Sequence, residues 1–77
     1  MITSKQISGA RAILGISQTI LAKKAGLALT TISRIEKSED FLNTAGVDTI
    51  KKIKLAFEEE GIEFLDDENG IGVRLKK

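Results

Sequence analysis

The segment Ser17–Glu36 constrains the fold of this 77-residue chain more than any other part of the sequence. Apolar residues recur in it at the three- and four-residue spacing of a helix, on both sides of Gly26. These inward positions are Leu21, Ala25, Leu27, Ile32 and Ile35. Glycine permits the left-handed backbone of a tight turn, and Ala22 is small enough for a second helix to cross closely over the first. The sequence therefore predicts two short helices joined by a tight turn. The second helix then has four outward positions, Leu29, Thr30, Ser33 and Arg34.

Helix signals also lie on either side of this segment. Thr3 and Gln6 form a capping-box pattern, and Gly15 ends the helix that they begin. The four predicted helices cover about 3–14, 17–25, 29–37 and 47–60. The last helix carries Ile50, Ile53 and Phe57 as its apolar stripe. We expect residues 38–46 to form a loop from which Phe41 and Leu42 point inward.

After Gly61 the hydrophobic period changes from the helical value to alternation. Ile62–Asp66 and Ile71–Leu75 read as two strands, and Asn69-Gly70 predicts a type I′ hairpin turn between them. That turn implies the pairs Phe64 with Leu75, Leu65 with Arg74, and Glu63 with Lys76. A lone hairpin is marginal in water, so it must pack on the helices, pair with another chain, or do both.

The composition narrows the class of protein. The chain has no cysteine and no histidine, which excludes disulfides, Cys/His zinc sites and nucleophilic chemistry based on these residues. It shows no Gly-rich phosphate loop, metal cluster or nucleophile paired with a base, so we expect neither an enzyme nor a cofactor or metal. With no secretory signal and no apolar run near the roughly 20 residues that cross a bilayer, we expect no membrane association and a cytoplasmic location.

The net charge of +1 hides an uneven distribution. Residues 1–57 carry nine lysines and arginines against four acidic residues, a net +5. Residues 58–77 carry three against seven, a net −4. A basic body with an acidic end suits a protein that lays one face on phosphate and turns the other away, although ordinary scatter of surface charge is the simpler alternative.

In its arrangement of Gln18, Leu21-Ala22, Ala25-Gly26-Leu27 and Thr31-Ile32-Ser33-Arg34-Ile35-Glu36, the segment Ser17–Glu36 resembles the lambda-repressor-like, Cro-type (XRE) helix-turn-helix family. Looser similarity extends over about three-quarters of the chain. The resemblance implies a mostly α fold, a four-helix DNA-binding domain, here with a C-terminal β-hairpin. We expect one domain, with a helical core over 1–61 and the hairpin over 62–77.

The resemblance also implies roles for individual residues. Gln18 aligns with a glutamine that binds phosphate at a helix N-terminus. Leu29, Thr30, Ser33 and Arg34 align with positions facing the major groove, where Arg34 is suited to bidentate bonding with guanine. Lys37 and Ser38 follow this helix and are expected to bond phosphate. Arg11 and Glu36 align with a partly buried structural ion pair.

The chain departs from the family pattern at several positions. Ala28 stands where a Ser or Thr usually caps the recognition helix, which costs about 1 kcal/mol of helix stability. Ile20 and Leu29 are apolar where the family often has polar residues, which puts base reading by Leu29 in doubt. The hairpin lies outside the family's common core.

These observations predict a transcriptional regulator that binds double-stranded DNA as a homodimer, with the open edge of the hairpin pairing two copies and Leu55 adding to the contact. The alternative is a protein-interaction module, such as an antitoxin-like partner of a toxin, built on the same scaffold. Exposed Ile20 and Leu29 and the low net charge favour that alternative.

Overall fold

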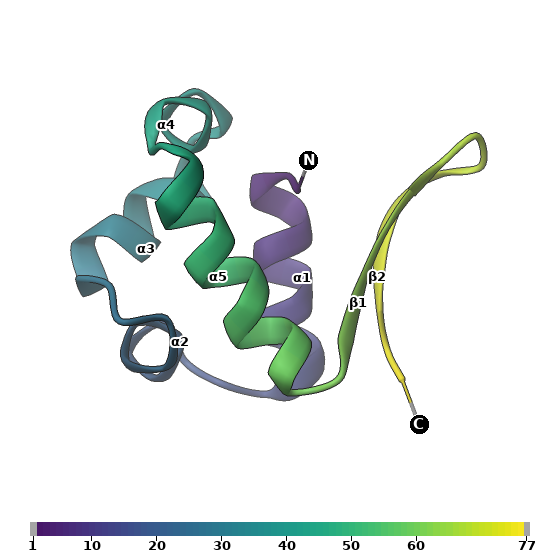
Figure 1. Ribbon diagram of the computed structural model, residues 1–77, viewed down its shortest axis with the longest axis horizontal. Coiled ribbons are helices and arrows are strands. Elements are labelled where there is room, and N and C mark those ends of the chain that lie inside the picture. The colour runs from purple at the N-terminus through teal and green to yellow at the C-terminus, as the bar shows by residue number, and fades with distance from the viewer. Residues whose placement is uncertain (1, 77) are drawn as a thin grey trace.

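The structure of the protein is a computed structural model that describes residues 2–76. Over this range it is mostly helical, with five helices followed by an antiparallel hairpin (Figure 1). The elements are α1 (Ser4–Leu14), α2 (Gln18–Ala25), α3 (Leu29–Lys37), α4 (Glu39–Thr44), α5 (Val47–Glu59), β1 (Ile62–Asp67) and β2 (Gly70–Leu75). The hairpin lies on the far side of α1 and α5 from α2 and α3 (Figure 1).

The predicted caps of α1 are present. The Thr3 hydroxyl accepts from Gln6 N and the Gln6 side chain accepts from Thr3 N, at 3.1 and 2.8 Å, which completes the capping box. Gly15 takes φ 69 at the other end, so that the N–H groups of Gly15 and Ile16 reach back to the last turn. This paired bonding ends the helix in one step and sends the chain directly into α2.

The loop predicted over 38–46 is wrong, because residues Glu39–Thr44 form the short helix α4. Ser38 caps it by accepting from Phe41 N at 3.1 Å, and two acidic residues occupy its first turn, where they favour the helix dipole. Leu42 is fully buried and anchors the helix to the core. The Glu39 carboxylate also accepts from Ser4 N at 2.9 Å, so α4 caps the start of α1.

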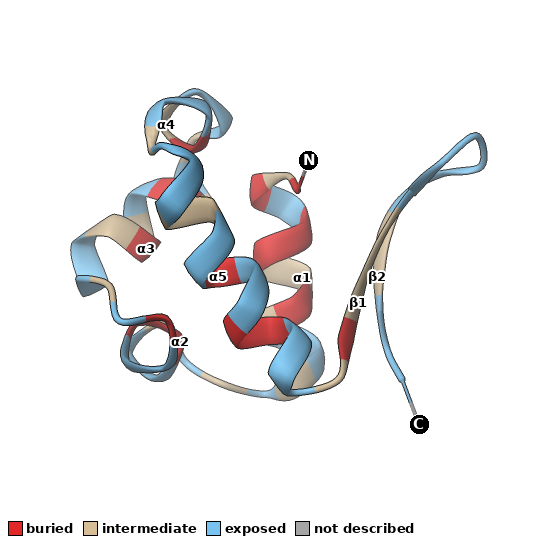
Figure 2. Ribbon diagram, viewed as in Figure 1, coloured by how far each residue is buried: buried red, intermediate tan, exposed pale blue. Residues whose placement is uncertain are grey.

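The core lies where α1, α2, α3 and α5 face one another, with Leu42 and Ile62 closing it (Figure 2). Its fully buried large side chains are Phe57, Ile7, Leu21, Ile32, Ile35, Leu42, Ile53 and Ile62. The predicted inward positions are therefore confirmed, except that Leu27, Phe41 and Ile50 are only partly buried at its margin. Among residues 2–76, every buried side-chain nitrogen or oxygen has a hydrogen-bond partner.

The hairpin exists, but its predicted register and turn type are wrong. Phe64 pairs with Val73 and Leu65 with Gly72, two residues away from the predicted partners, and Glu63 pairs with Arg74. No residue other than glycine within 2–76 has a positive φ, which excludes a type I′ turn with Asn69 at its centre.

The turn that forms instead is held by a side chain. Asp67 Oδ1 accepts from Asn69 N at 2.8 Å, which fixes Glu68 and Asn69 as the turn residues. Gly70 follows with φ 131 and opens β2. The Asx turn therefore sets the register one residue earlier in each strand than an Asn-Gly turn requires.

The hairpin docks on the helices through its inner face. β2 lies against α1 and β1 against α5. The rings of Phe57 and Phe64 meet edge to face, with centroids 5.8 Å apart. Gln6 Nε2 donates to the carbonyl oxygens of Leu65 and Gly72, at 3.0 and 2.9 Å, so one buried amide ties α1 to both strands.

Across residues 2–76, no helix has both the length and the apolar character that a membrane span needs.

Candidate nucleic-acid interface

The turn between α2 and α3 is rigidly built. Gly26 takes φ 70 and ψ 37 after the last residue of α2. Leu27 N donates to Ala22 O at 2.9 Å and Gly26 N donates to Lys23 O at 3.3 Å, which is the bonding pattern of a Schellman motif. Leu27 packs its side chain against the core just before α3 begins. The sequence therefore fixes the angle between the helices through a glycine and one apolar plug.

α3 carries sharply different residues on its two sides. Ile32 and Ile35 are fully buried, whereas Thr30 and Arg34 are exposed, Leu29 is 46% exposed and Ser33 is half-buried. The four residues expected to face outward thus share the side of α3 that points away from the core. Ala28 has no hydroxyl or carboxylate, so no side chain caps α3, as the sequence predicts.

Arg34 has a neighbour that sequence reasoning placed only in the core. The guanidinium carbon of Arg34 lies 5.9 Å from the centre of the Phe41 ring, which is half-buried on α4. This cation–π contact restricts the rotamers of an otherwise exposed side chain. Arg34 and Phe41 are seven residues apart, a spacing that brings two side chains together only if the segment between them is helical. Because the sequence predicts a loop over 38–46, it does not predict this contact.

The expected phosphate-binding residues lie at the ends of helices. Gln18 is half-buried at the first position of α2, whose cap Ser17 accepts from Ile20 N at 3.1 Å. Lys37 is exposed at the end of α3. Ser38 ends α3 and caps α4 at once; its oxygen accepts from Phe41 N, and its hydroxyl hydrogen can still be donated.

Arg11 and Glu36 form the ion pair that the resemblance implies. Arg11 Nη2 and Nε donate to the two carboxylate oxygens of Glu36 at 2.9 and 3.0 Å, and Ser8 Oγ adds a third bond at 3.0 Å. The Glu36 side chain is only 6% exposed, against 27% for Arg11. Arg11 also donates to Ile16 O at 3.1 Å. The pair therefore joins α1 to the end of α3.

The pKa of Glu36 reflects two opposing effects. Burial alone raises the pKa of this carboxyl, but hydrogen bonds from Arg11, Ser8 and Gln18, with the charge of Arg11, outweigh burial and leave it below its ordinary value. The hydrogen bond with Glu36 in turn raises the pKa of Arg11. Both groups are therefore ionised at neutral pH.

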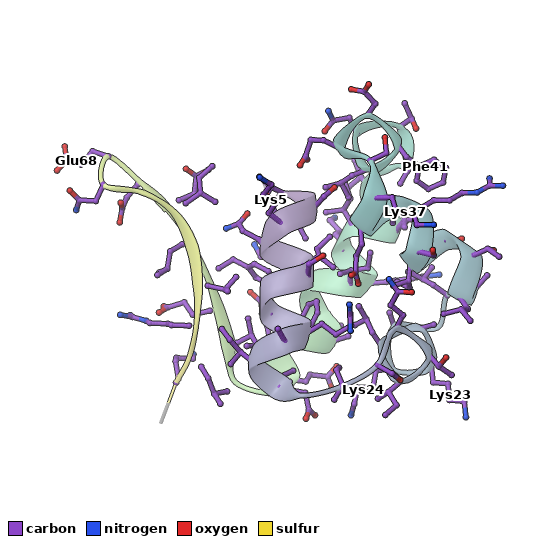
Figure 3. The ribbon with its side chains drawn as sticks, turned by 180° about the vertical axis from the view of Figure 1, so that it is seen from behind. Lys5, Lys23, Lys24, Lys37, Phe41 and Glu68 are labelled. Carbon is purple, nitrogen blue, oxygen red and sulfur yellow. The ribbon has the colours of Figure 1, made fainter. Side chains whose placement is uncertain are left out.

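Exposed charges of both signs lie on the helical body, and the hairpin tip is acidic. The lysines Lys23, Lys24 and Lys37 lie on the helical body, whereas Glu68 lies at the hairpin tip on the opposite side (Figure 3). Lys24 Nζ lies 3.4 Å from a carboxylate oxygen of Glu60, which neutralises part of its charge. The other basic residues of α2 and α3 are Lys23, Arg34 and Lys37, which are all exposed.

A groove lies on another side of α5. It has a volume of about 350 Å³ between α5, β1 and the N-terminal part of α1, and is lined by Ile2, Gln6, Val47, Ile50, Lys51, Lys54 and Phe64. Its walls are mostly apolar, with two lysines among them. No group of three or more potential acidic metal ligands comes together in the described part of the chain.

Comparison with known proteins adds no family. No model of a protein family matches the chain. A search of curated proteins also finds no match.

Proposed function

We propose that this protein is a sequence-specific DNA-binding transcriptional regulator of the lambda-repressor-like, Cro-type helix-turn-helix family, and that α3 enters the major groove. The observation that carries the proposal is the two-sided character of α3. Ile32 and Ile35 fix its inner side, while Thr30, Ser33 and Arg34 lie outward on a helix whose entry angle is set at Gly26. An outward helix with polar, hydrogen-bonding side chains is the means by which this motif reads base edges.

Arg34 is the main base-reading residue of the proposal. A guanidinium can donate two parallel hydrogen bonds to guanine O6 and N7. The Phe41 ring beneath it narrows the orientations that Arg34 samples before binding, which lowers the entropy lost on contact. Thr30 and Ser33 contribute further hydrogen bonds, and Leu29 lies where it can contact a thymine methyl.

Phosphate contacts supply most of the affinity and position α3. Gln18 lies at the N-terminus of α2, where free N–H groups favour an anion, whereas Lys37 and Ser38 lie at the junction of α3 and α4, where their side chains can bond phosphate. The ion pair between Arg11 and Glu36 stabilises the end of α3 without contacting DNA. In this arrangement the hairpin, with its acidic tip, faces away from the duplex.

The proposed active species is a homodimer on a pseudo-palindromic site, with half-sites about one helical turn, roughly 34 Å, apart. A chain of this size buries a modest core, and a second copy would add stability. The C-terminal hairpin is the proposed contact between copies, because a two-stranded sheet leaves its outer edges free to pair.

The decisive experiment compares variants on selected DNA. Binding sequences are first selected from random duplexes, and affinity is then measured at several salt concentrations. Arg34→Ala should lower affinity for the selected site about 10- to 100-fold and relax the choice of base at one position. Lys37→Ala should weaken binding to all sequences and reduce the salt slope by about 1.

Lys54→Ala is the matched control, because Lys54 is also an exposed lysine and lines the groove beside β1. It should leave both the affinity and the salt slope unchanged. Selection that enriches no sequence, or binding insensitive to both salt and Arg34→Ala, would contradict the proposal.

A protein-interaction module, such as an antitoxin-like partner, is the second candidate. It is favoured by Ile20 and Leu29, which are 43% and 46% exposed on the two helices of the motif. Under this alternative, replacing both with serine abolishes partner binding while Arg34→Ala does not, and duplex DNA does not bind even at low salt.

A further inference from the structure

Along β2, the backbone N–H and C=O groups of successive residues face β1 and the free edge in turn, and one hydrogen bond shows which residues face which way. Lys76 N donates to Gly61 O at 2.9 Å, which makes these two residues a hydrogen-bonded pair of the antiparallel ladder. Every second pair along the hairpin is hydrogen-bonded in the same way, so the backbone N–H and C=O groups of Gly72 and Arg74 also face β1. The backbone N–H and C=O groups of the residues between them therefore face away from β1.

Those outward residues are Ile71, Val73 and Leu75. Outside the strand ladder, no hydrogen bond among residues 2–76 uses their backbone groups. Ile71 and Leu75 are also 58% and 43% exposed, although both are large and apolar. Val73, between them, faces α1, where a Cβ on Gly9 would lie 3.5 Å from its Cγ2. The edge thus combines unpaired backbone with uncovered apolar side chains.

We propose that two copies of the chain pair through the β2 edge, antiparallel, with a two-fold axis at Val73. This deepens the homodimer part of the proposed function and rests on it, but does not depend on DNA binding. In this register Val73 opposes Val73 of the second copy, and Ile71 opposes Leu75 of the second copy in both directions. Each of these pairs can exchange two hydrogen bonds. An axis one or two residues away leaves Ile71 or Leu75 without an apolar neighbour.

Charge complementarity supports the same register. Lys76 of the second copy falls opposite Gly70, which has no side chain and is itself paired with Asp67. The lysine can therefore reach across Gly70 to Asp67 and Glu68 at the hairpin tip. No two like charges face each other directly, because Arg74 opposes Gly72 of the second copy.

The β1 edge offers no such match. An antiparallel pair centred on Phe64 would set the exposed carboxylate of Asp66 opposite Ile62, which is only 1% exposed. The β2 edge instead borders an open groove of about 280 Å³ that Ile71 and Val73 help to line. Pairing brings Leu75 of the second copy to the mouth of this groove and covers apolar surface.

Single-cysteine variants of the full chain test the register, because the chain contains no cysteine of its own. In a hydrogen-bonded antiparallel pair the Cα atoms lie about 5.5 Å apart, within the range of a disulfide. Val73→Cys should give disulfide-linked dimers in most of the protein under mild oxidation. Ile71→Cys alone and Leu75→Cys alone should not, whereas an equal mixture of the two should. Val47→Cys, at an exposed position on α5, is the control that should stay monomeric.

Ile71→Pro separates edge pairing from folding. Its N–H faces the free edge, so proline removes no hairpin hydrogen bond, and the far-UV circular dichroism should change little. Sedimentation equilibrium should show that this variant is monomeric where the parent chain is dimeric.

Two results overturn the proposal, and each leaves the DNA question open to its own assay. A parent chain that is dimeric but gives no Val73→Cys cross-link pairs through another surface. A parent chain that is monomeric at several hundred micromolar and gives no cross-link does not form this dimer. Whether the monomer binds DNA in a salt-dependent way then tests the proposed DNA binding separately.

Discussion

The protein should lose more stability when Arg11 is removed from its ion pair with Glu36 than when the Glu36 carboxylate is neutralised. The Glu36 side chain is 6% exposed and accepts hydrogen bonds from Arg11 and Ser8, so Arg11→Met leaves a buried charge with only the neutral side chains of Ser8 and Gln18 beside it. Such uncompensated charges cost about 3–5 kcal/mol. Glu36→Gln leaves Arg11, which is 27% exposed and still bonds Ile16 O, and this should cost only about 2 kcal/mol.

The double variant completes the argument. With both charges gone no uncompensated ion remains, so the double variant should be no less stable than Arg11→Met alone. The coupling between the two positions should then be at least about 2 kcal/mol. Urea unfolding followed by circular dichroism measures all four free energies, because a small single domain usually unfolds in two states.

The exposed pair of Arg74 and Glu63 provides the control, since its side chains are 63% and 36% exposed. The same substitutions there should show a coupling below about 1 kcal/mol. The reasoning from burial is refuted if Arg11→Met costs no more than Glu36→Gln, or if the coupling of the buried pair is as small as that of the exposed one.

Three further predictions concern stability. The pKa of Glu36 lies below its ordinary value because its hydrogen bonds outweigh its burial, so its contribution should be complete above the unfolded pKa of about 4.3 and be lost as the pH falls through the folded pKa. Urea midpoints between pH 7 and pH 3 should therefore fall less for Glu36→Gln than for the parent chain. Gln6→Glu replaces the amide nitrogen that donates to Leu65 O and Gly72 O with an oxygen that repels both carbonyl oxygens. This should cost about 2 kcal/mol or more of stability and speed amide hydrogen exchange in the hairpin. Unchanged exchange would show that these two hydrogen bonds do not hold the hairpin on α1. Ala28→Ser supplies the missing cap of α3 and should stabilise the protein by about 1 kcal/mol, seen as a thermal midpoint roughly 4–8 °C higher.

Local signals were sufficient for the first three helices and for α5. For α1 and α2 the caps and end glycines lie within a few residues of the helix ends, so Thr3, Gly15 and Gly26 specify boundaries without reference to the rest of the fold. The helices α3 and α5 have no side-chain cap and were predictable from their apolar periodicity. The outward side of α3 was predictable for the same reason, because helical periodicity alone separates Ile32 from Arg34.

The parts that sequence reasoning missed depend on contacts between distant segments. α4 has only six residues, too few for a clear period, and it is held by the burial of Leu42 and by the bond from Ser4. The contact of Arg34 with Phe41 could not be predicted without it. The second role of Gln6 also escaped, because its partners lie 59 and 66 residues away.

The hairpin shows a strong local signal overruled by a competing one. Asn69-Gly70 favours a type I′ turn, but the side chain of Asp67 bonds Asn69 N and moves the turn. The resulting register sets Phe64 opposite Val73, with both rows of inner side chains facing the helices. The Asx turn and the Asn-Gly turn are centred one residue apart along the chain, and the alternation of apolar positions alone does not favour either of them.

Ser38 has a consequence for how mutations spread through this small domain. It is both the last cap of α3 and the first cap of α4, so no spare residue separates the two helices. A short linker would absorb a small displacement, but a shared cap transmits it as a change of tilt. Substitutions at Leu42, far from the outward side of α3, are therefore expected to change the orientation of the whole of α3. Their effect is not confined to the segment in which they occur.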